Sequence, residues 1–188
     1  MSRRLTTYDI VLAGRGGQGV IFLSRVMGLA ALGQGLGVRT TETHGMAMRG
    51  GSVQCFVRIG DVYGPLFRMG SGDLLMVLHP AETSLARPLL SAEGSILVND
   101  AGTETPLPAG KGQKVFLVDA DGIARDCGNA RSVNLALLGG AVALVKGFPL
   151  KAASIEEAIV KSGPPKAVEK NLEVFRKGLG TADDLEKI

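Results

Sequence analysis

Residues 8–19 read YDIVLAGRGGQG, a short apolar run that passes directly into a glycine-rich turn. The residues that follow, VIFLSRVMGLAAL at 20–32, place apolar side chains at the spacing of a buried helix. A glycine-rich stretch that starts at Gly33 is typical of a helix end, and residues 38–43 predict a second strand. The order of strand, glycine loop, helix and strand predicts a βαβ unit.

An antiparallel insertion is predicted next along the chain. Residues 53–59 alternate in hydrophobicity, which is typical of a half-buried strand. Gly60 and Asp61 predict a turn into a partner strand near 62–67, so that a hairpin interrupts the alternation of strands and helices. Three further apolar runs predict strands buried on both faces of a parallel sheet with helices on each side, at 73–78, 95–99 and 114–119.

Helices are predicted between and after these strands, at 80–90 with a break near Pro88, at 121–127 and at 134–146. Ser154 and Glu157 match a capping box that would start a further helix, and residues 166–178 carry one apolar stripe at helical spacing. Together the elements predict a single α/β domain over residues 1–188. It is expected to be Rossmann-like and mainly parallel, with an inserted β-hairpin and C-terminal helices, a core at about 8–150 and a helical extension at about 154–180.

Composition excludes several classes of protein. A chain of 188 residues, 45% hydrophobic and 21% charged, is long enough to bury a core without disulfides or a structural metal. Its 27 glycines show no three-residue period, which excludes a collagen-like fibre. The longest nearly apolar stretch, 133–145, is shorter than the roughly 20 residues that a membrane span needs, and the N-terminus has no signal-peptide pattern. We therefore expect no membrane contact.

Cysteines and charge narrow the expected partners. Cys55 and Cys127 stand far apart without a second cysteine nearby, so neither predicts a disulfide or a metal cluster, and a reducing cytoplasm is expected. His44 and His79 do not complete a metal site with them, so no metal is expected on this chain. The net charge of +3 is dispersed, which makes nucleic acid an unexpected partner.

The glycine loop predicts a phosphate site. Gly14, Gly16 and Gly19 match G-x-G-x-x-G after a strand and before a helix. Glycine allows a sharp turn and lets backbone N–H groups approach a phosphate, and the positive end of the helix dipole attracts the anion. The alternative is a tight turn that binds no ligand.

A second polar cluster is predicted at the carboxyl end of the second strand, where open α/β sheets bind ligands. Arg49 would clamp a carboxylate or phosphate there, and Glu42 and His44 lie just before it. Glu42 follows Gly19 by 23 positions, close to the offset of the ribose-binding acid in nicotinamide sites, so NAD stays possible. The alternative is a solvated loop with a surface salt bridge. Asn129, Arg131 and Asn134 form a third polar group, predicted to cap a helix or dock against it.

Several motifs in order carry a family resemblance. These are GRGGQGVIFLSRVMGLAA, ETHGMAMRGGSVQCFVRIG, GPL, GDLLMVL, GNARSVNLALLGG and PPKAVEKNLEVFRKG, which together extend from about Asp9 to Gly178. The chain resembles the small (beta) subunit of indolepyruvate ferredoxin oxidoreductase, and with it the gamma subunits of the 2-oxoacid:ferredoxin oxidoreductases. The segment His44-Gly45-Met46 resembles the arylpyruvate branch more than the 2-oxoglutarate branch. At Arg15 the chain departs from the small or apolar residue that relatives often carry.

The resemblance implies a role in a heteromeric enzyme. That enzyme would convert a 2-oxo acid and coenzyme A to an acyl-CoA and carbon dioxide, with ferredoxin as electron acceptor. Thiamine diphosphate and 4Fe-4S clusters would belong to a large alpha subunit, on which the C-terminal extension is expected to pack. The two cysteines of this chain agree, because a 4Fe-4S cluster needs four thiolates.

The resemblance also assigns residues. It implies that the loop binds the phosphates of coenzyme A through Gly14, Gly16, Gly17, Gln18 and Gly19. Glu42, His44 and Arg49 are candidates to line the interface where acyl transfer occurs. Three alternatives stay open: a gamma subunit for another 2-oxo acid (pyruvate, 2-oxoglutarate or a branched-chain acid), a free-standing NAD(P)-binding reductase, and a structural module whose loop stays empty.

Overall fold

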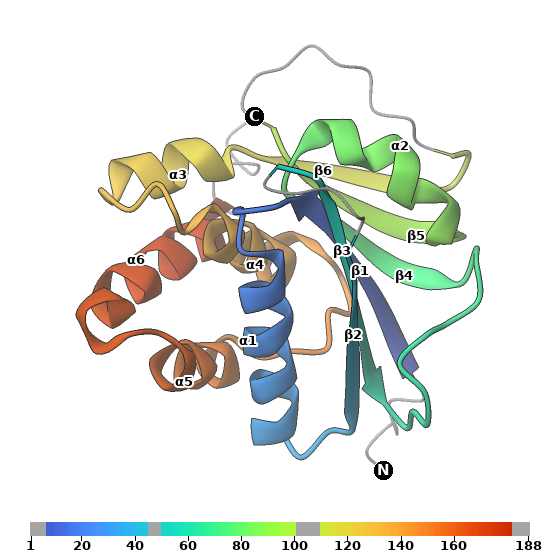
Figure 1. The fold of residues 1–188 in the computed structure, drawn as a ribbon, viewed down its shortest axis with the longest axis horizontal. Helices are drawn as coiled ribbons and strands as arrows, with labels where there is room; N and C mark the ends of the chain where they lie inside the picture. The colour runs from blue at the N-terminus through green and yellow to red at the C-terminus, as the bar shows by residue number, and fades with distance from the viewer. Residues whose placement is uncertain (1–6, 45–49, 101–109, 182–188) are drawn as a thin grey trace.

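A six-stranded sheet organises the molecule, with the strand order β2-β3-β1-β4-β5-β6 (Figure 1). The structure is a computed structural model that describes residues 7–44, 50–100 and 110–181. The strands are β1 (Thr7–Arg15), β2 (Val38–His44), β3 (Ser52–Gly60), β4 (Gly72–Val77), β5 (Leu90–Asn99) and β6 (Lys114–Val118). The α/β class with a mixed, mostly parallel sheet is confirmed.

One strand runs against the others. β1, β4, β5 and β6 pair in parallel, whereas β3 pairs antiparallel with both β1 and β2. Consequently β2 is not a neighbour of β1, and the strands of the predicted βαβ unit are separated by β3. The inserted antiparallel hairpin is thus formed by β2 and β3.

The prediction of a second hairpin strand near 62–67 is wrong. This segment is a loop, because both edges of β3 are already occupied by β1 and β2. Arg58 holds the loop instead, donating from Nη1 to the carbonyls of Gly64 (3.1 Å) and Leu66 (2.8 Å). Phe67 then packs edge-on against Phe56 at 5.4 Å between ring centroids.

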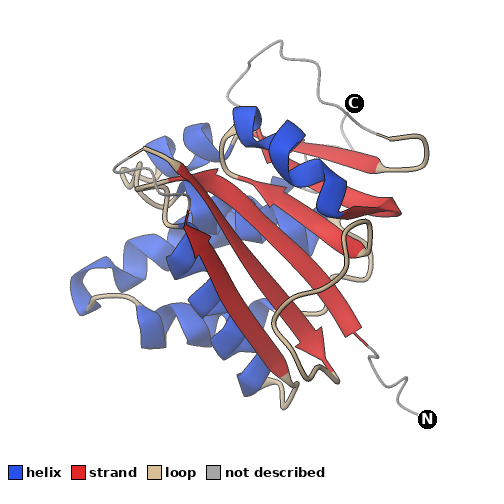
Figure 2. Ribbon diagram, turned by 45° about the vertical axis from the view of Figure 1, so that its right-hand side comes forward, coloured by secondary structure: helices blue, strands red, loops and turns tan. Residues whose placement is uncertain are grey.

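The two faces of the sheet are covered unequally (Figure 2). One face carries α1 (Val20–Gly33), α3 (Ala120–Asp126), α4 (Val133–Leu144), α5 (Ala152–Ser162) and α6 (Val168–Leu179). Of the described residues, the other face carries the short helix α2 (Thr83–Ala86), flanked by 3-10 turns at Pro80–Glu82 and Arg87–Leu89, together with the 61–71 loop. A further 3-10 turn, Pro165–Ala167, precedes α6.

Alternation along β1 explains how both layers form. Ile10 and Leu12 pack toward the larger helical layer, and Val11 and Ala13 pack toward α2, all four fully buried. The expectation of two buried faces holds for β4 but not for β6, because β6 is an edge strand and its Leu117 is 51% exposed.

The C-terminal helices pack on the chain's own core. Ile155, Ile159, Val174 and Phe175 are buried in the same cluster as the helical face of β1. The Ser154–Glu157 capping box is wrong, since α5 starts at Ala152 after Lys151, whose backbone N–H donates to Gln34 Oε1 at 2.6 Å.

Helices α4 and α6 approach each other through glycines. A Cβ at Gly139 would collide with the Phe175 carbonyl oxygen, and a Cβ at Gly178 with the Ala136 carbonyl oxygen. The two backbones are therefore in direct contact, which fixes α4 relative to α6. Among the described helices, none is both long and apolar enough to span a bilayer.

Candidate functional site

The glycine loop joins β1 to α1 at the carboxyl end of the sheet. Two of its residues have left-handed backbone angles, Gly17 at φ 100° and Gly19 at φ 75°. A Cβ added at Gly17 would have no atom within 4 Å, so the outer side of the loop is open. The loop thus combines a turn that requires glycine with space for a ligand.

Helix α1 begins directly behind the loop. Its first backbone bond runs from the Leu23 N–H to the Gly19 carbonyl at 2.9 Å. The N–H groups of residues 20–22 precede this bond and have no acceptor within the helix, and the first turn carries no acidic side chain. Such a helix start favours an anion electrostatically.

Gln18 shapes the loop from inside. Its Oε1 accepts from the Arg15 N–H at 2.7 Å, and its Nε2 donates to the Leu78 carbonyl at 3.2 Å. Its own backbone N–H donates to the Arg15 carbonyl at 3.0 Å. Gln18 therefore ties the loop to the end of β4.

The two glycine motifs of the sequence meet in space. The Gly16 N–H donates to the Gly51 carbonyl at 2.9 Å, and a Cβ on Gly16 would lie 3.2 Å from the Gly50 nitrogen. Gly50 has φ 95° with open space around its Cβ position. Gly50 and Gly51, which directly precede β3, therefore lie against the loop.

Sequence reasoning missed a buried support, Asn99. Its Nδ2 donates to the Leu78 carbonyl at 3.2 Å, the same oxygen that receives Gln18, and to Asp121 Oδ2 at 2.8 Å. Its Oδ1 accepts from the backbone N–H groups at the start of α3. The available signal was a polar residue closing the apolar run SILVN, at the strand end where polar groups gather.

Asn134 supports the loop from the side of α4. Its Nδ2 donates to the Gly19 carbonyl at 3.0 Å. Asn134 therefore docks against the start of α1, which is one of the two roles predicted for this polar group. Asn129 and Ser132 contact α6 instead, where both donate to Asn171 Oδ1, at 3.0 and 2.8 Å.

Arg15 points to the other face of the sheet. Its Nε donates to Glu82 Oε1 at 3.2 Å, and the side chain of Glu82 is only 10% exposed. This pair links the loop to the segment before α2. Glu82 was not a sequence candidate.

Of the three candidates in this part of the sequence, Glu42 and His44 lie on β2, and Arg49 comes after it in the chain. His44 pairs with Val53, which pairs with Gly14, so the backbone of His44 is level with the loop, two strands away at about 10 Å. Glu42 is level with Leu12, two residues further from the edge. Arg49 lies outside the described residues.

Glu42 has an electrostatic neighbour in Cys55, which opposes it on β3. Burial raises the pKa of the Cys55 thiol to about 11, and the Glu42 carboxylate adds to this shift. The thiol is therefore protonated near neutral pH and is a poor nucleophile and metal ligand.

The geometry argues against the nicotinamide alternative. A ribose-binding acid belongs at the end of the strand next to β1, in parallel orientation. On the side where β2 lies, the neighbour of β1 is the antiparallel β3, and Glu42 lies one strand further out.

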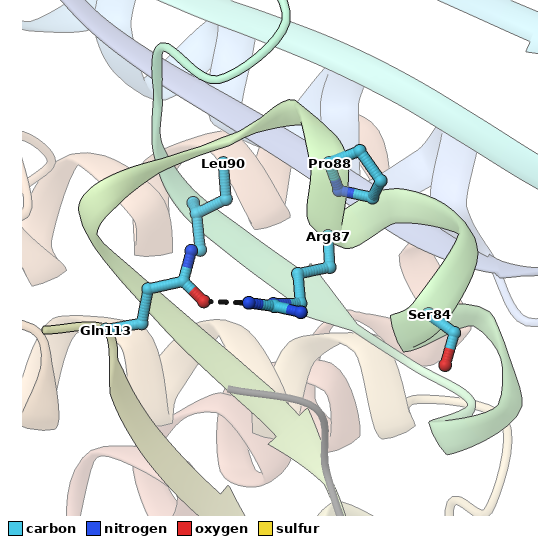
Figure 3. A pocket seen from close by; sticks show the side chains of 5 residues that line it. All are labelled: Ser84, Arg87, Pro88, Leu90 and Gln113. Carbon is cyan, nitrogen blue, oxygen red and sulfur yellow. Dashed lines mark hydrogen bonds between the residues drawn. The ribbon is translucent and has the colours of Figure 1, made fainter. Parts of the chain in front are cut away.

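Two cavities lie away from the loop. One, of about 350 Å³, is lined by Ser84, Arg87, Pro88, Leu90 and Gln113 (Figure 3). Arg87 Nε donates to Gln113 Oε1 there at 3.2 Å. The other, of about 430 Å³, lies between the end of α1 and the start of α5. Within 7–44, 50–100 and 110–181, no three His, Cys, Asp or Glu side chains gather as a metal site would require.

The chain is similar in sequence to known proteins. Residues 9–181 match the family model of pyruvate ferredoxin/flavodoxin oxidoreductase. The indolepyruvate oxidoreductase subunit IorB of Methanothermobacter thermautotrophicus is 33% identical, over 93% of this chain and 97% of that protein.

Solved structures share the fold. The gamma subunit of the keto/oxoacid ferredoxin oxidoreductase from Geobacter sulfurreducens superimposes with a TM-score of 0.79 at 28% identity, over 93% of this chain and 98% of that one. The 2-oxoglutarate:ferredoxin oxidoreductase from Magnetococcus marinus, solved with 2-oxoglutarate, coenzyme A and succinyl-CoA bound, also gives 0.79, at 21% identity. This match covers 95% of the present chain and 31% of the Magnetococcus chain, and it shows likeness of fold alone.

Proposed function

The chain belongs to the pyruvate ferredoxin/flavodoxin oxidoreductase family, and from this premise we propose that it is the small subunit of an indolepyruvate ferredoxin oxidoreductase. The observation that carries the proposal is the 33% identity to an indolepyruvate oxidoreductase subunit over nearly the full length of both chains. The assembled enzyme would oxidatively decarboxylate an arylpyruvate with coenzyme A. The products are an arylacetyl-CoA and carbon dioxide, and the electrons pass to ferredoxin.

Within that enzyme, the loop from Gly14 to Gly19 binds the phosphates of coenzyme A. The first-turn N–H groups of α1 are the donors, and the open space at Gly17 admits the anion. Gly14 and Gly16 permit the close packing of the loop, and Gln18 holds it to β4. The ligand set therefore comes mainly from the backbone, which suits a phosphate that must be bound and released.

The residues on and after β2 serve the neighbouring interface. His44 is level with the loop, so it belongs to the edge at which an acyl group would reach the coenzyme A thiol. Arg49 follows it in the chain and is proposed for the same role from the sequence alone. Glu42 lies further back, beside the buried Cys55, and its contribution is to the charge of this edge.

A large partner subunit supplies the remaining chemistry. The chain has only two cysteines, too few for a 4Fe-4S cluster, and both are buried. The family resemblance implies that a partner alpha subunit holds thiamine diphosphate and the clusters, and we propose ferredoxin as the acceptor of the complex and the cytoplasm as its location.

The test is co-expression with the thiamine-dependent large subunit, followed by an assay of dye or ferredoxin reduction. Indolepyruvate is compared with pyruvate, 2-oxoglutarate and a branched-chain 2-oxo acid. We expect coenzyme A-dependent activity that requires both chains and is highest with indolepyruvate. Preference for another acid would reassign the substrate. Tight NADH binding by the chain alone, without complex formation, would overturn the subunit assignment.

A further inference from the structure

We propose that Asn134 is a positioning residue for the anion loop: its side-chain amide orients the Gly19–Val20 peptide so that the Val20 N–H points toward the ligand. This inference rests on the proposed function, because it concerns how the loop is held for the phosphates. It assigns a role to a residue of α4 that is distant from the loop in sequence.

The contacts of Asn134 use both ends of its amide. Nδ2 donates to the Gly19 carbonyl at 3.0 Å, and Oδ1 accepts from the Leu135 N–H at 2.9 Å. The residue is 3% exposed, so water does not compete freely for these bonds. Its orientation is thereby defined by two partners on different elements.

The Gly19 carbonyl is the critical acceptor. It receives Asn134 Nδ2 and also the Leu23 N–H that starts the hydrogen-bond ladder of α1. In a planar trans peptide the C=O and the following N–H point in opposite directions. Drawing the Gly19 carbonyl toward α4 and α1 therefore turns the Val20 N–H outward, into the open end of the helix.

The glycine and the asparagine occupy one space. A Cβ on residue 19 would overlap Asn134 Nδ2. The absence of a side chain at Gly19 is therefore needed for the amide of Asn134 to reach the carbonyl, as well as for the left-handed φ.

Asn134 is itself held by a rigid support. Ser132, which directly precedes α4, is tied to α6 by its hydrogen bond to Asn171 Oδ1. Within the helix pair, Gly139 and Gly178 bring the two backbones into contact. The amide is thus preorganised, which lowers the entropy lost when the loop binds an anion.

The experiment measures the co-expressed complex carrying Asn134→Ala or Asn134→Asp. Both changes remove the donor, but only the first is neutral, so it separates the lost hydrogen bond from added charge. We expect Asn134→Ala to raise the KM for coenzyme A about five- to tenfold, with kcat and the KM for the 2-oxo acid unchanged. Asn134→Asp should raise it further, because the carboxylate repels the phosphates.

Asn129→Ala is the matched control. It removes an equivalent amide donor five positions away, but one that faces α6 rather than the loop. Thermal unfolding of each variant reports any general loosening. We expect Asn129→Ala to lower Tm without changing the KM for coenzyme A.

Two results would overturn the inference. One is an equal rise in KM with Asn129→Ala, which would indicate nonspecific loosening of α4. The other is an unchanged KM with Asn134→Ala while Gly17→Ala, a direct change in the loop, raises it; the proposed function would then stand alone. If neither Asn134→Ala nor Gly17→Ala moves the KM, the assignment of the loop to coenzyme A fails and the inference fails with it.

Discussion

Glycines have opposite structural roles in two regions of this molecule, the β1–α1 loop and the contact between α4 and α6. In the β1–α1 loop, Gly17 leaves open space where a side chain would project. At the α4–α6 crossing, Gly139 and Gly178 have backbone atoms of the other helix in that space. The first kind keeps room for something outside the chain, and the second removes room so that the chain contacts itself. A glycine count alone does not distinguish these two uses.

Substitutions of the glycines at the α4–α6 crossing should give the largest loss of stability. Gly139→Ala or Gly178→Ala would force a methyl group against a backbone carbonyl, which cannot rotate away. We expect a loss of about 3 kcal/mol or more in the free energy of unfolding, or no soluble chain. Urea unfolding measures this. Gly140→Ala is the control, because the three atoms nearest to its Cβ all belong to the Val118 side chain, the closest at 2.9 Å, and a side chain can move aside at a lower cost. Equal losses at 139 and 140 would contradict the backbone-contact argument.

Gly19 lies in the loop but also has another residue in the space of its missing side chain, so its substitution should give the second-largest loss of stability. Its φ of 75° is strained for alanine, and the new Cβ would displace Asn134. Gly19→Ala should therefore lower stability by about 2 kcal/mol and also raise the KM for coenzyme A in the complex. Thermal unfolding and steady-state kinetics on one preparation test this. A stability loss with an unchanged KM would place Gly19 with the crossing glycines.

Substitution of Gly17 tests the role of a glycine that has open space at its Cβ position. Gly17→Ala adds strain at φ 100° but meets no atom, and Gly35→Ala, at the far end of α1, does the same at φ 73°. Both should lose about 1 kcal/mol of stability. Only the Gly17 variant should raise the KM for coenzyme A, by about tenfold, because its methyl group enters the ligand space. Equal KM values would remove Gly17 from the site.

Substitution of Gly33 should give the smallest change in stability, because this glycine neither borders the ligand space nor contacts another backbone. It is the last residue of α1, its Cβ position is open, and its φ is outside the left-handed range. Gly33→Ala should stabilise the chain by up to about 1 kcal/mol, since alanine has the higher helix propensity. A rise in Tm with unchanged kinetics is the expected result. A fall in Tm would show that the end of α1 needs glycine.

Local patterns predicted the elements well because each was encoded by its own residues. The YDIVLA run, the glycine loop and the helix at 20–32 correspond to β1, the loop and α1. Strand order was less predictable, because β3 inserts between β1 and β2 through pairings that local hydrophobicity does not specify. The error at 62–67 has the same cause, since alternation identifies a strand but not a free edge for it to join.

The candidate site was predicted in part for a similar reason. The G-x-G-x-x-G spacing located the loop, but not the inward role of Gln18, because that depends on the Leu78 carbonyl being within reach. Asn134 was noted as a polar residue at a helix start. Its bond to Gly19 depends on α4 being placed beside α1, which only the tertiary packing provides.

The position of β1 in the sheet has a consequence for synthesis. Its two neighbours are β3 and β4, so its pairings reach from Thr7 to Gly60 on one side and from Ile10 to Leu74 on the other. During synthesis, β1 therefore cannot complete its pairing until β4, which ends at Val77, has emerged from the ribosome. Such long-range closure slows folding and leaves β1 exposed to aggregation or to chaperones during translation. The loop that follows β1 gains its final shape only after that delay.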